Sequence, residues 1–327
     1  MPRTGTWEQA IGSRLRLRDL FVLFTVVECG SMSKAALRLG VSTPSISDVI
    51  AGLEHAVGVR LLDRSSSGVT PTAYGTALLV RAHAAFDELH QGMRDIESLS
   101  DPAAGEVRIG CPESVTAFLT FVIEAISRKH PRMRFDVQQV RTPTVEFPEL
   151  HDRRIDLVLA RLVALPQGGR LGEDLDAEVL FDDPFSAVVG RRSKWARRRK
   201  VDLAELANER WIVTPLDALA GRFLTEAFAA RGLDPPRPAI ASFSIHLRTN
   251  LASRGDYVAV LPRSVLELSA GRYGLKRLPI TLSAKPSPVA LVTLRNRSLT
   301  PAVRAFMAAA REVGKGMSTG SRPDKGR

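Results

Sequence analysis

The stretch from Gly30 to His55 limits what this chain can fold into more than any other part of it. Apolar residues before and within it recur at helical spacing, so residues 18–29 and 33–39 predict two helices. Thr43-Pro44 begins a third, because proline is tolerated in a first helical turn. The expected inward faces are formed by Leu20, Phe21, Phe24 and Val27, by Ala35, Ala36 and Leu39, and by Ile46, Ile50, Leu53 and Val57.

The third helix has a polar flank of small side chains. Thr43, Ser45, Ser47 and Asp48 lie outside its apolar face. Two helices joined by a short turn, the second with small hydrogen-bonding residues, are typical of a helix-turn-helix that enters the DNA major groove. Small residues let the helix approach the base edges, with which hydroxyl groups form hydrogen bonds. On periodicity alone, an ordinary helical bundle with a solvated polar face is the alternative.

Residues 58–75 predict a β-hairpin, or wing, with a polar tip. Around this wing and the helices before it, a dozen positions in one order form a pattern with fixed gaps. They are Ser31/Ser33, Ala35-Ala36, Leu39, Val41-Ser42-Thr43-Pro44-Ser45-Ile46-Ser47, Leu53-Glu54, Gly58, Leu61-Leu62-Asp63-Arg64 and Thr70-Pro71-Thr72. In these positions the chain resembles the winged helix-turn-helix of the LysR-type transcriptional regulators.

The chain departs from that family at two places on the third helix. Glutamine is usual where Thr43 stands, and a basic residue followed by glutamine is usual at Asp48-Val49. Thr43 lacks the amide that reads adenine, and Asp48 brings a negative charge near phosphates, so the preferred DNA sequence is affected but the fold is not. The resemblance implies DNA contacts by Ser33, Lys34, Arg38, Thr43, Pro44, Ser45, Ser47, Asp48, Arg60, Arg64 and Thr70.

Residues 73–100 contain no proline and predict one long helix. Its apolar positions alternate spacings of three and four, which is a coiled-coil pattern. One interpretation is a helix packed on its own domain. The other is dimerisation, which the resemblance implies because family members pair through such a helix and a winged helix reads only a short half-site. The seam consists of Leu79, Ala82, Phe86, Leu89, Met93 and Ile96.

After residue 105 short β patterns alternate with helical ones, which predicts parallel sheets, crossover helices and two α/β subdomains. A cleft between two such subdomains is a favoured place for a small ligand. Strands are expected at 106–110, 135–140, 156–160, 185–189, 211–213, 239–243, 257–261 and 288–294, and helices at 115–129, 221–231, 245–253 and 301–313.

This half resembles the effector-binding module of the same family, which is similar to periplasmic solute-binding proteins. The matching stretches are 105–110, 150–156 and 254–262, where Tyr257 replaces a usual second glycine. Together the resemblances cover residues 14–313. They imply a multidomain protein with an all-α winged helix-turn-helix at 14–76, a linker and dimerisation helix at 77–100, and an α/β effector domain at 105–315. Within the effector domain, subdomain I is expected at about 105–180 and 297–315 and subdomain II at about 181–296. The basic tail, from 314 on and at least over 316–327, is expected to be disordered.

Polar residues follow several expected strands, where ligands of α/β domains usually bind. Ser114 stands at a helix start, where backbone N–H groups favour an anion. Family members often bind small organic acids through a serine at this place, although a plain helix cap is the alternative and Glu113 opposes an anion. Other candidates, each also suited to a turn, are Cys111, Thr142, Thr144, Thr214, Pro215, Leu216, Ser244 and His246.

The amino-acid composition limits the kinds of partner and ligand that we expect for this protein. A net charge of +11 favours a polyanion. Residues 191–200 form the densest basic run, which we interpret as a solvated surface segment because it is far from the wing in sequence. Cys29 and Cys111 have no metal-ligand neighbours, so we expect free thiols, no metal and no cofactor. Without a long apolar segment or a signal peptide, the protein is expected in the cytoplasm.

These features predict a sequence-specific transcriptional regulator, a homodimer or homotetramer, that binds promoter DNA and responds to a small-molecule effector in the cleft. RNA polymerase is a further candidate partner. An enzyme using the same cleft is one alternative, against which the sequence has no phosphate-binding glycine loop, nucleophile elbow or metal spacing. A solute-binding transport protein is another, and the lack of a signal peptide disfavours it.

Overall fold

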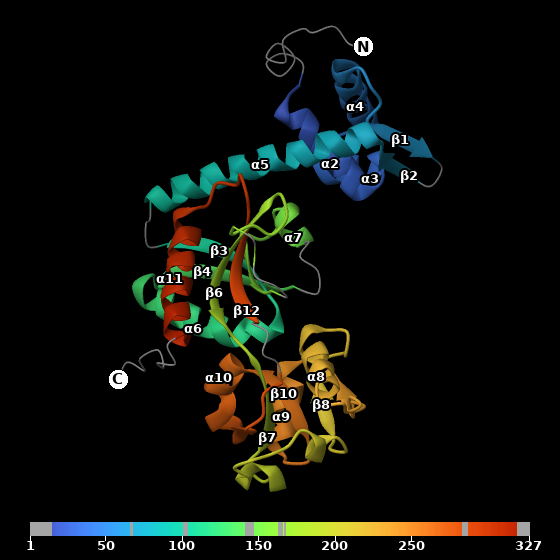
Figure 1. Ribbon diagram of the computed structural model, residues 1–327. Coiled ribbons are helices and arrows are strands. Elements are labelled where there is room, and N and C mark those ends of the chain that lie inside the picture. Colours follow the sequence, from blue (N-terminus) through green and yellow to red (C-terminus); the bar gives the residue numbers. More distant parts are fainter. Residues whose placement is uncertain are drawn as a thin grey trace. The chain divides into compact units, whose positions relative to one another are not determined.

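The computed structural model describes residues 15–65, 68–100, 104–140, 147–162, 166, 168–282 and 287–318. The chain divides into two units, residues 1–90 and 91–327. The first unit contains α2 (Leu17–Cys29), α3 (Met32–Leu39), α4 (Thr43–Val57), the strands β1 (Leu62–Ser65) and β2 (Gly68–Pro71), and the beginning of α5 (Ala73–Ser100) (Figure 1). The predicted order of three helices, a wing and a long helix is confirmed.

Glycines end the three short helices of the first unit. Gly30, Gly40 and Gly58 have φ of 63°, 67° and 76°, the left-handed region that glycine enters without a steric cost. Ser42 is the N-cap of α4, and its hydroxyl oxygen accepts a hydrogen bond from the Ser45 N–H at 3.3 Å. These local signals explain why the boundaries of α2, α3 and α4 were predictable.

The core of the first unit lies between α2, α3 and α4. Leu23 and Val26 of α2 meet Ala35, Ile46 and Ile50 there, and all five side chains are buried. The predicted inward face of α2 was partly wrong, because Phe21 is exposed, and its ring meets that of Phe86 on α5 edge to face, with 6.0 Å between the centroids. Leu20 is buried as predicted, whereas Leu23 and Val26, which were not among the predicted inward residues, are buried as well.

The wing is tied to α4 by a carboxylate. Glu54 Oε1 accepts hydrogen bonds from the N–H groups of Leu61 and Leu62, at 2.8 and 3.2 Å. The Thr72 hydroxyl donates to the Arg60 carbonyl oxygen at 2.8 Å and closes the base of the hairpin. The position of β1 and β2 relative to α4 is therefore fixed by specific hydrogen bonds.

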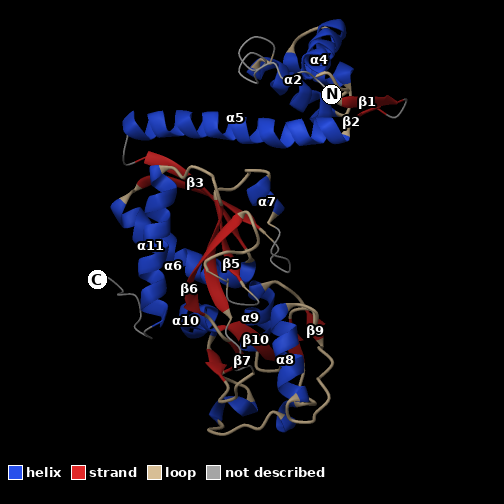
Figure 2. Ribbon diagram, turned by 45° about the horizontal axis from the view of Figure 1, so that its top comes forward, coloured by secondary structure: helices blue, strands red, loops and turns tan. Residues whose placement is uncertain are grey.

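The second unit contains two five-stranded sheets, which Figure 2 shows with their covering helices. The first sheet has the order β4-β3-β5-β12-β6 and the second β11-β7-β10-β8-β9. The strands are β3 (Ala104–Cys111), β4 (Arg132–Gln139), β5 (Leu157–Arg161), β6 (Leu175–Asp182), β7 (Phe185–Gly190), β8 (Trp211–Val213), β9 (Ile240–Ala241), β10 (Val258–Pro262), β11 (Leu275–Arg277) and β12 (Pro288–Leu294). The helices are α6 (Thr116–Lys129), α7 (Pro148–His151), α8 (Leu219–Ala229), α9 (Ile245–Ser253), α10 (Arg263–Tyr273) and α11 (Pro301–Ser318).

Two expectations for this unit were wrong. The sheets are mixed and not parallel, since β12 runs antiparallel to β5 and β6, and β7 runs antiparallel to β10 and β11. In addition, β12 belongs to the first sheet, although residues 288–294 were assigned to the second subdomain. A strand that returns to a distant partner leaves no local sequence signal. We therefore define subdomain I by its sheet, as residues 104–182 and 288–318, and subdomain II as residues 183–287.

The C-terminal helix is longer than predicted. Disorder was expected from residue 314 onward, but α11 continues to Ser318. Met317 is buried in the core of the first sheet with Phe306, Val313 and residues of β3. Burial of this apolar side chain extends the helix through a segment rich in glycine and lysine, and only residues 319–327 of the expected tail lie outside the described residues.

Candidate DNA interface and effector site

The first two turns of α4 present several side chains to solvent. Pro44, Ser45 and Asp48 are exposed, and Thr43 is half-buried. The Ser45 hydroxyl lies 2.9 Å from that of Ser42, so the two form a small hydrogen-bonding cluster at the helix start. This surface carries hydroxyl groups and one carboxylate, which can accept and donate hydrogen bonds without placing a long side chain between the helix and a base edge.

Ser47 does not share that surface. It is half-buried, and its hydroxyl donates to the Met32 Sδ atom at 3.4 Å. Met32 itself belongs to the core of the unit. The prediction that Ser47 points away from the core was therefore wrong, because its position on α4 turns toward α3.

The predicted phosphate-binding residues differ in whether another side chain of the protein already pairs with them. Ser33 and Lys34 are exposed on α3, and Arg60, Arg64 and Thr70 are exposed in the wing region. Arg38 forms an ion pair with Glu28, with 2.7 Å between Nη1 and Oε2. A hydrogen bond with Cys29 and the charge of Glu28 raise the pKa of Arg38. Contact of Arg38 with a phosphate would compete with Glu28.

Sequence reasoning missed Leu37 as a candidate. Its side chain is 85% exposed on α3, next to Arg38. An apolar side chain held in solvent is able to contact a thymine methyl group in the major groove. The available signal was its place outside the inward face formed by Ala35, Ala36 and Leu39.

In the second unit, one carboxylate joins the two subdomains close to Ser114. Glu113 stands in the short 3-10 turn Glu113–Val115 after β3, and its Oε1 accepts a hydrogen bond from the Ile245 N–H at 2.6 Å. Ile245 is the first residue of α9 in subdomain II, and Ser244 caps the same helix by accepting from the Leu247 N–H at 3.2 Å. The structure thus brings the predicted residues Ser114 and Ser244 to one boundary, with Glu113 on the positive end of the α9 dipole.

A buried guanidinium stands one turn along α9. Arg248 donates from Nη1 to the Val260 carbonyl oxygen at 2.6 Å and from Nη2 to that of Phe243 at 3.3 Å. Burial lowers the pKa of Arg248 to about 10, and the charge of Glu113 opposes this shift. Arg248 is therefore a cation at neutral pH, and its Nε has no hydrogen-bond partner among residues placed in the structure.

The other predicted effector residues of subdomain II lie in the turn after β8 and on α9. Thr214 is buried, and its hydroxyl accepts a hydrogen bond from the Gly221 N–H at 3.2 Å. Pro215 is half-buried and Leu216 is exposed in the same turn, while His246 is exposed on α9 and contacts Asn250. The Ser242 N–H donates to the Val213 carbonyl oxygen at 2.8 Å, which brings the turn after β8 close to the start of α9.

Cys111 is unsuited to ligand contact. It ends β3 inside the hydrophobic core with Val107 and Ile109, and burial raises the pKa of its thiol to about 12. Its position at the end of a strand suggested a pocket residue, but the alternation of side chains along β3 points it into the core. Thr142 and Thr144 lie outside the described residues.

A second network at the subdomain boundary was missed entirely. Arg161, the last residue of β5, forms an ion pair with Asp183, with 2.5 Å between Nη2 and Oδ2 and side-chain exposures of 3% and 1%. The Asp183 carboxylate also accepts from the Ser264 hydroxyl at 2.7 Å, and Arg161 Nη1 donates to the Ser287 hydroxyl at 3.0 Å. The network therefore joins β5 and the start of α10 to the two places where the chain passes between the sheets, at Asp183 and at Ser287.

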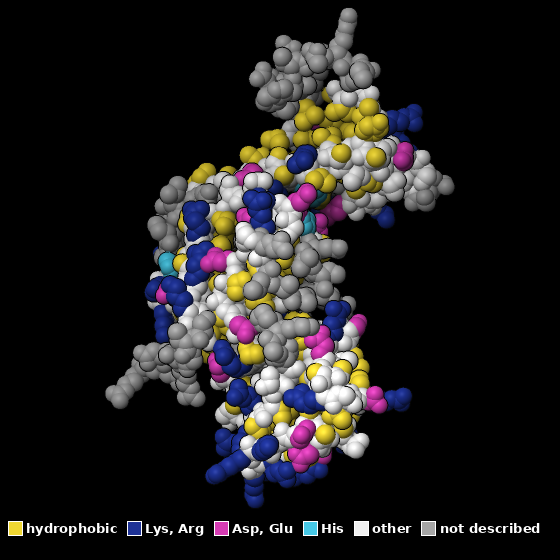
Figure 3. Space-filling view, viewed as in Figure 1, with side chains coloured by type: hydrophobic (Ala, Val, Ile, Leu, Met, Phe, Trp, Pro, Cys, Tyr) yellow, Lys and Arg dark blue, Asp and Glu magenta, His cyan; other side chains and the backbone are white. Residues whose placement is uncertain are grey.

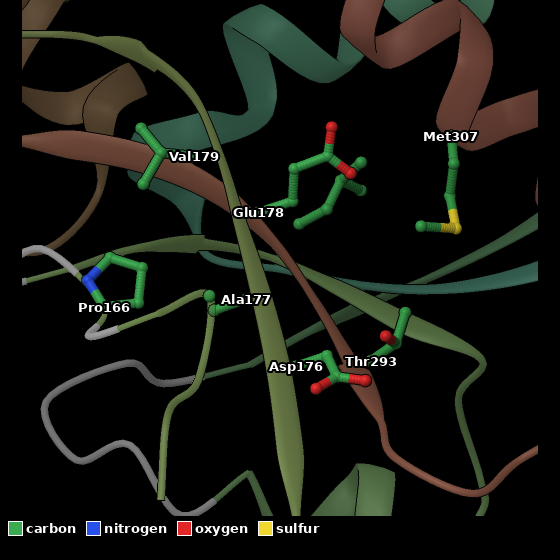
Figure 4. A pocket seen from close by; sticks show the side chains of 9 residues that line it. Pro166, Asp176, Ala177, Glu178, Val179, Thr293 and Met307 are labelled. Atoms are coloured by element: carbon green, nitrogen blue, oxygen red, sulfur yellow. The ribbon is translucent and has the colours of Figure 1, made fainter.

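A hollow with a volume of about 670 Å³ lies beside β6, and none of the predicted effector residues lines it. Figure 4 shows Asp176, Glu178 and Val179 of β6 among the residues that line it, with Glu178 on the side of the strand where Met307 of α11 lies and Val179 on the other side. Both acids already form ion pairs, Asp176 with Arg295 and Glu178 with Arg311. The described residues that line this hollow therefore leave no charge free for a ligand.

The architecture defines a class: a winged helix-turn-helix joined by a long helix to a two-sheet α/β ligand domain. Comparison with known proteins agrees. Residues 17–76 match the bacterial regulatory helix-turn-helix protein model of the lysR family, and residues 100–315 match the LysR substrate binding domain. The chain belongs to the LysR family of transcriptional regulators and is a DNA-binding regulator with an effector domain.

The relatives are full-length regulators. The transcriptional regulator GbpR of Azospirillum brasilense is 26% identical over 306 residues, covering 91% of this chain and 86% of that protein. GalR of Pseudomonas putida is 27% identical, covering 90% and 73%. Among solved structures, CbnR in complex with its target DNA has a TM-score of 0.62 at 19% identity, covering 91% of this chain and 99% of that one, which shows a shared fold.

Two features are absent from the part of the chain that the structure describes. No three His, Cys, Asp or Glu side chains come together in a way that would hold a metal ion. None of the helices within the same residues is long and apolar enough to cross a membrane.

Proposed function

We propose that the first two turns of α4 read promoter DNA in the major groove through Thr43, Pro44, Ser45 and Asp48, with Ser33, Lys34, Arg38, Arg60, Arg64 and Thr70 contacting the backbone. The observation that carries this proposal is the exposed cluster at the start of α4, which has small side chains only. Thr43 cannot form the two hydrogen bonds to adenine that an amide forms, so hydroxyl contacts and the charge of Asp48 set the preferred bases.

The experiment is selection of bound duplexes from a random pool by the full chain, followed by affinity measurement on the selected sequence. Ser45→Ala removes one hydroxyl contact and should weaken the selected duplex by about fivefold, the effect of one hydrogen bond of about 1 kcal/mol. Ser47→Ala is the matched control, because that hydroxyl is turned toward Met32. Equal losses for both variants, or none for either, would remove the first turn of α4 from the interface.

The effector is proposed to bind at the boundary of the two subdomains, near Ser114, Thr214, Pro215, Leu216, Ser244 and His246. The contact of Glu113 with the Ile245 N–H bears on its chemistry, since the start of α9 is the natural place for a carboxylate and this chain already fills it with its own. An organic acid would have to displace Glu113, whereas a ligand with an amino group could pair with it.

This proposal is tested by thermal shift with small acids and amines. Glu113→Gln keeps the shape and removes the charge, so stabilisation by acids should increase and stabilisation by amines should fall. Ser114→Ala should reduce stabilisation by either class if its hydroxyl contacts the ligand. Unchanged ligand-induced shifts in both variants would place the effector elsewhere.

We propose a homodimer or homotetramer in which two chains pair through α5. Leu79 and Ala82 are buried within the first unit, but Leu89, Met93 and Ile96 of the same seam are 51%, 58% and 58% exposed. Apolar side chains in heptad-like register favour a second helix as partner. Leu89→Glu with Met93→Glu should lower the oligomeric state in analytical ultracentrifugation.

We also propose that the protein is located in the cytoplasm and contacts RNA polymerase, because both follow from its role as a transcriptional regulator.

A further inference from the structure

The positive charge of this regulator is distributed unevenly. Residues 1–90, which contain the whole helix-turn-helix, have nine Lys or Arg and eight Asp or Glu. Subdomain II, residues 183–287, has eighteen Lys or Arg and nine Asp or Glu. Nine of the eleven net positive charges therefore reside in a part of the ligand domain and not in the unit that reads DNA.

The excess is concentrated on one segment that the structure holds in place. From residue 191 to 200 every basic side chain is exposed, while Ser193, Trp195 and Ala196 between them are buried. Ser193 accepts a hydrogen bond from the Trp195 N–H at 3.4 Å, which starts a short 3-10 helix (Lys194–Arg197). The backbone is thus anchored, and its cations are directed outward.

Strand β11 adds to the same surface. It pairs antiparallel with β7, so Lys276 and Arg277 lie opposite Val189 and Val188, next to the start of the basic segment. The Arg191 N–H also donates to the Gly274 carbonyl oxygen at 2.8 Å. Figure 3 shows Lys and Arg side chains gathered over the end of subdomain II that carries β7 and the segment after it. We call residues 191–200 with Lys276 and Arg277 the basic surface.

Most of these cations are not neutralised by the protein. Lys194 pairs with Glu209 and Arg198 with Glu205, at 2.7 and 2.8 Å. Within the described ranges, the remaining five side chains of the segment (Arg191, Arg192, Arg197, Arg199 and Lys200) and both cations of β11 have no side-chain hydrogen bond or ion pair. A solvated surface usually mixes both signs, and seven unpaired cations in one segment and the strand beside it favour a polyanionic partner.

We propose that the basic surface binds the phosphate backbone of DNA, as a second contact in addition to that of the helix-turn-helix. The inference rests on the DNA binding of this family member, and it explains how a nearly neutral reading unit obtains electrostatic attraction to a duplex. Arginine and lysine contacts to phosphates release counterions, independent of sequence, and dominate non-specific affinity. The alternative that the test must exclude is an acidic protein as the partner of this surface.

The test is salt-titrated fluorescence anisotropy of the full chain on a mixed-sequence duplex. The variant Arg197→Gln/Arg199→Gln/Lys200→Gln removes three cations of the basic surface. The control Arg222→Gln/Arg231→Gln/Arg237→Gln removes three cations on α8 and the loop after it, beside the opposite edge of the same sheet. Both sets change the net charge equally, so long-range charge effects cancel in their comparison.

We expect the slope of log affinity against log salt to become shallower by about 2.7 in the first variant, since each phosphate contact contributes about 0.9. The control should keep the wild-type slope. If both variants match wild type, or both lose equally, the DNA contact is overturned, and in the first case an acidic protein is the remaining partner class. A wild-type chain that ignores the duplex would overturn the proposed DNA reading as well, which separates the two failures.

Discussion

The helix-turn-helix unit and subdomain II approach charge in opposite ways. The first exposes small hydroxyl residues and Asp48 on α4 and is nearly neutral as a whole. The second carries the chain's excess of cations on a surface anchored by Trp195. Base reading needs close approach and hydrogen-bond geometry, whereas attraction to a duplex needs only charge. The comparison suggests that this regulator places the two tasks on different parts of its chain.

The two regions also differ in how they are held together. The first unit relies on an apolar core and on helix caps, and its ion pair Arg38–Glu28 is exposed. In the second unit, buried ion pairs stand at key junctions, Arg161–Asp183 between the subdomains and Arg297–Asp156 within subdomain I. Breaking a buried pair leaves an uncompensated charge, so the second unit should be far more sensitive to loss of a carboxylate.

The largest expected effect follows from that contrast. Asp183→Asn should lower the free energy of unfolding of the second unit by about 3–5 kcal/mol, because the Arg161 guanidinium stays buried without its counter-charge. Asp176→Asn, which removes an exposed partner of Arg295, should cost at most about 1 kcal/mol. Denaturant unfolding followed by the fluorescence of Trp195 and Trp211, both in subdomain II, measures this difference. Similar costs for the two variants would mean that the Arg161 network does not hold the subdomains together.

The corresponding change in the first unit acts through the core. Ile50→Ala removes a fully buried side chain and should destabilise that unit by about 2–5 kcal/mol. Leu37→Ala, at a position 85% exposed, should change stability by less than about 0.5 kcal/mol. Hydrogen exchange of α2 to α4 reports the unit separately from the effector domain. If Ile50→Ala also increased exchange in the second unit, the two would not be independently stable.

A substitution at Asp48 would make the helix-turn-helix unit more similar in charge to subdomain II. Asp48→Arg gives the second turn of α4 a cation and should raise non-specific affinity, with a slope of log affinity against log salt steeper by about 0.9. Asp48→Asn removes the charge without adding a phosphate contact, so its slope should stay near that of wild type. Affinity that does not change with either substitution would place Asp48 outside the interface.

The smallest expected effect compares the two thiols. Cys111 is buried and its pKa is raised to about 12, whereas Cys29 is half-buried in the first unit. Iodoacetamide should label Cys29 and spare Cys111 in the native chain near neutral pH. Because the folded pKa of Cys111 lies above its unfolded value, the stability it contributes is present below about pH 9 and is lost as pH rises toward 12. Rapid native labelling of Cys111 would contradict the packing of β3.

Sequence reasoning succeeded where structure depends on near neighbours. The glycines at 30, 40 and 58, the Ser42 cap and the apolar spacing of α4 define the helix-turn-helix locally. It failed where partners are distant: β12 joins β5 and β6, and Asp183 meets Arg161, Ser264 and Ser287 only after the chain has crossed between sheets. Ser47 was misplaced for a related reason, since Met32 on another helix decides its environment. The Glu113 contact with α9 likewise spans 132 residues.

The separation of base reading from charge attraction is tested most directly by salt-titrated anisotropy of two variants on a selected duplex and on a scrambled one. We predict that Ser45→Ala reduces the ratio of the two affinities and keeps the salt slope. The triple variant at Arg197, Arg199 and Lys200 should keep the ratio and make the slope shallower. If the triple variant lost the ratio, or Ser45→Ala changed the slope as much, both tasks would belong to one surface and the account would be wrong.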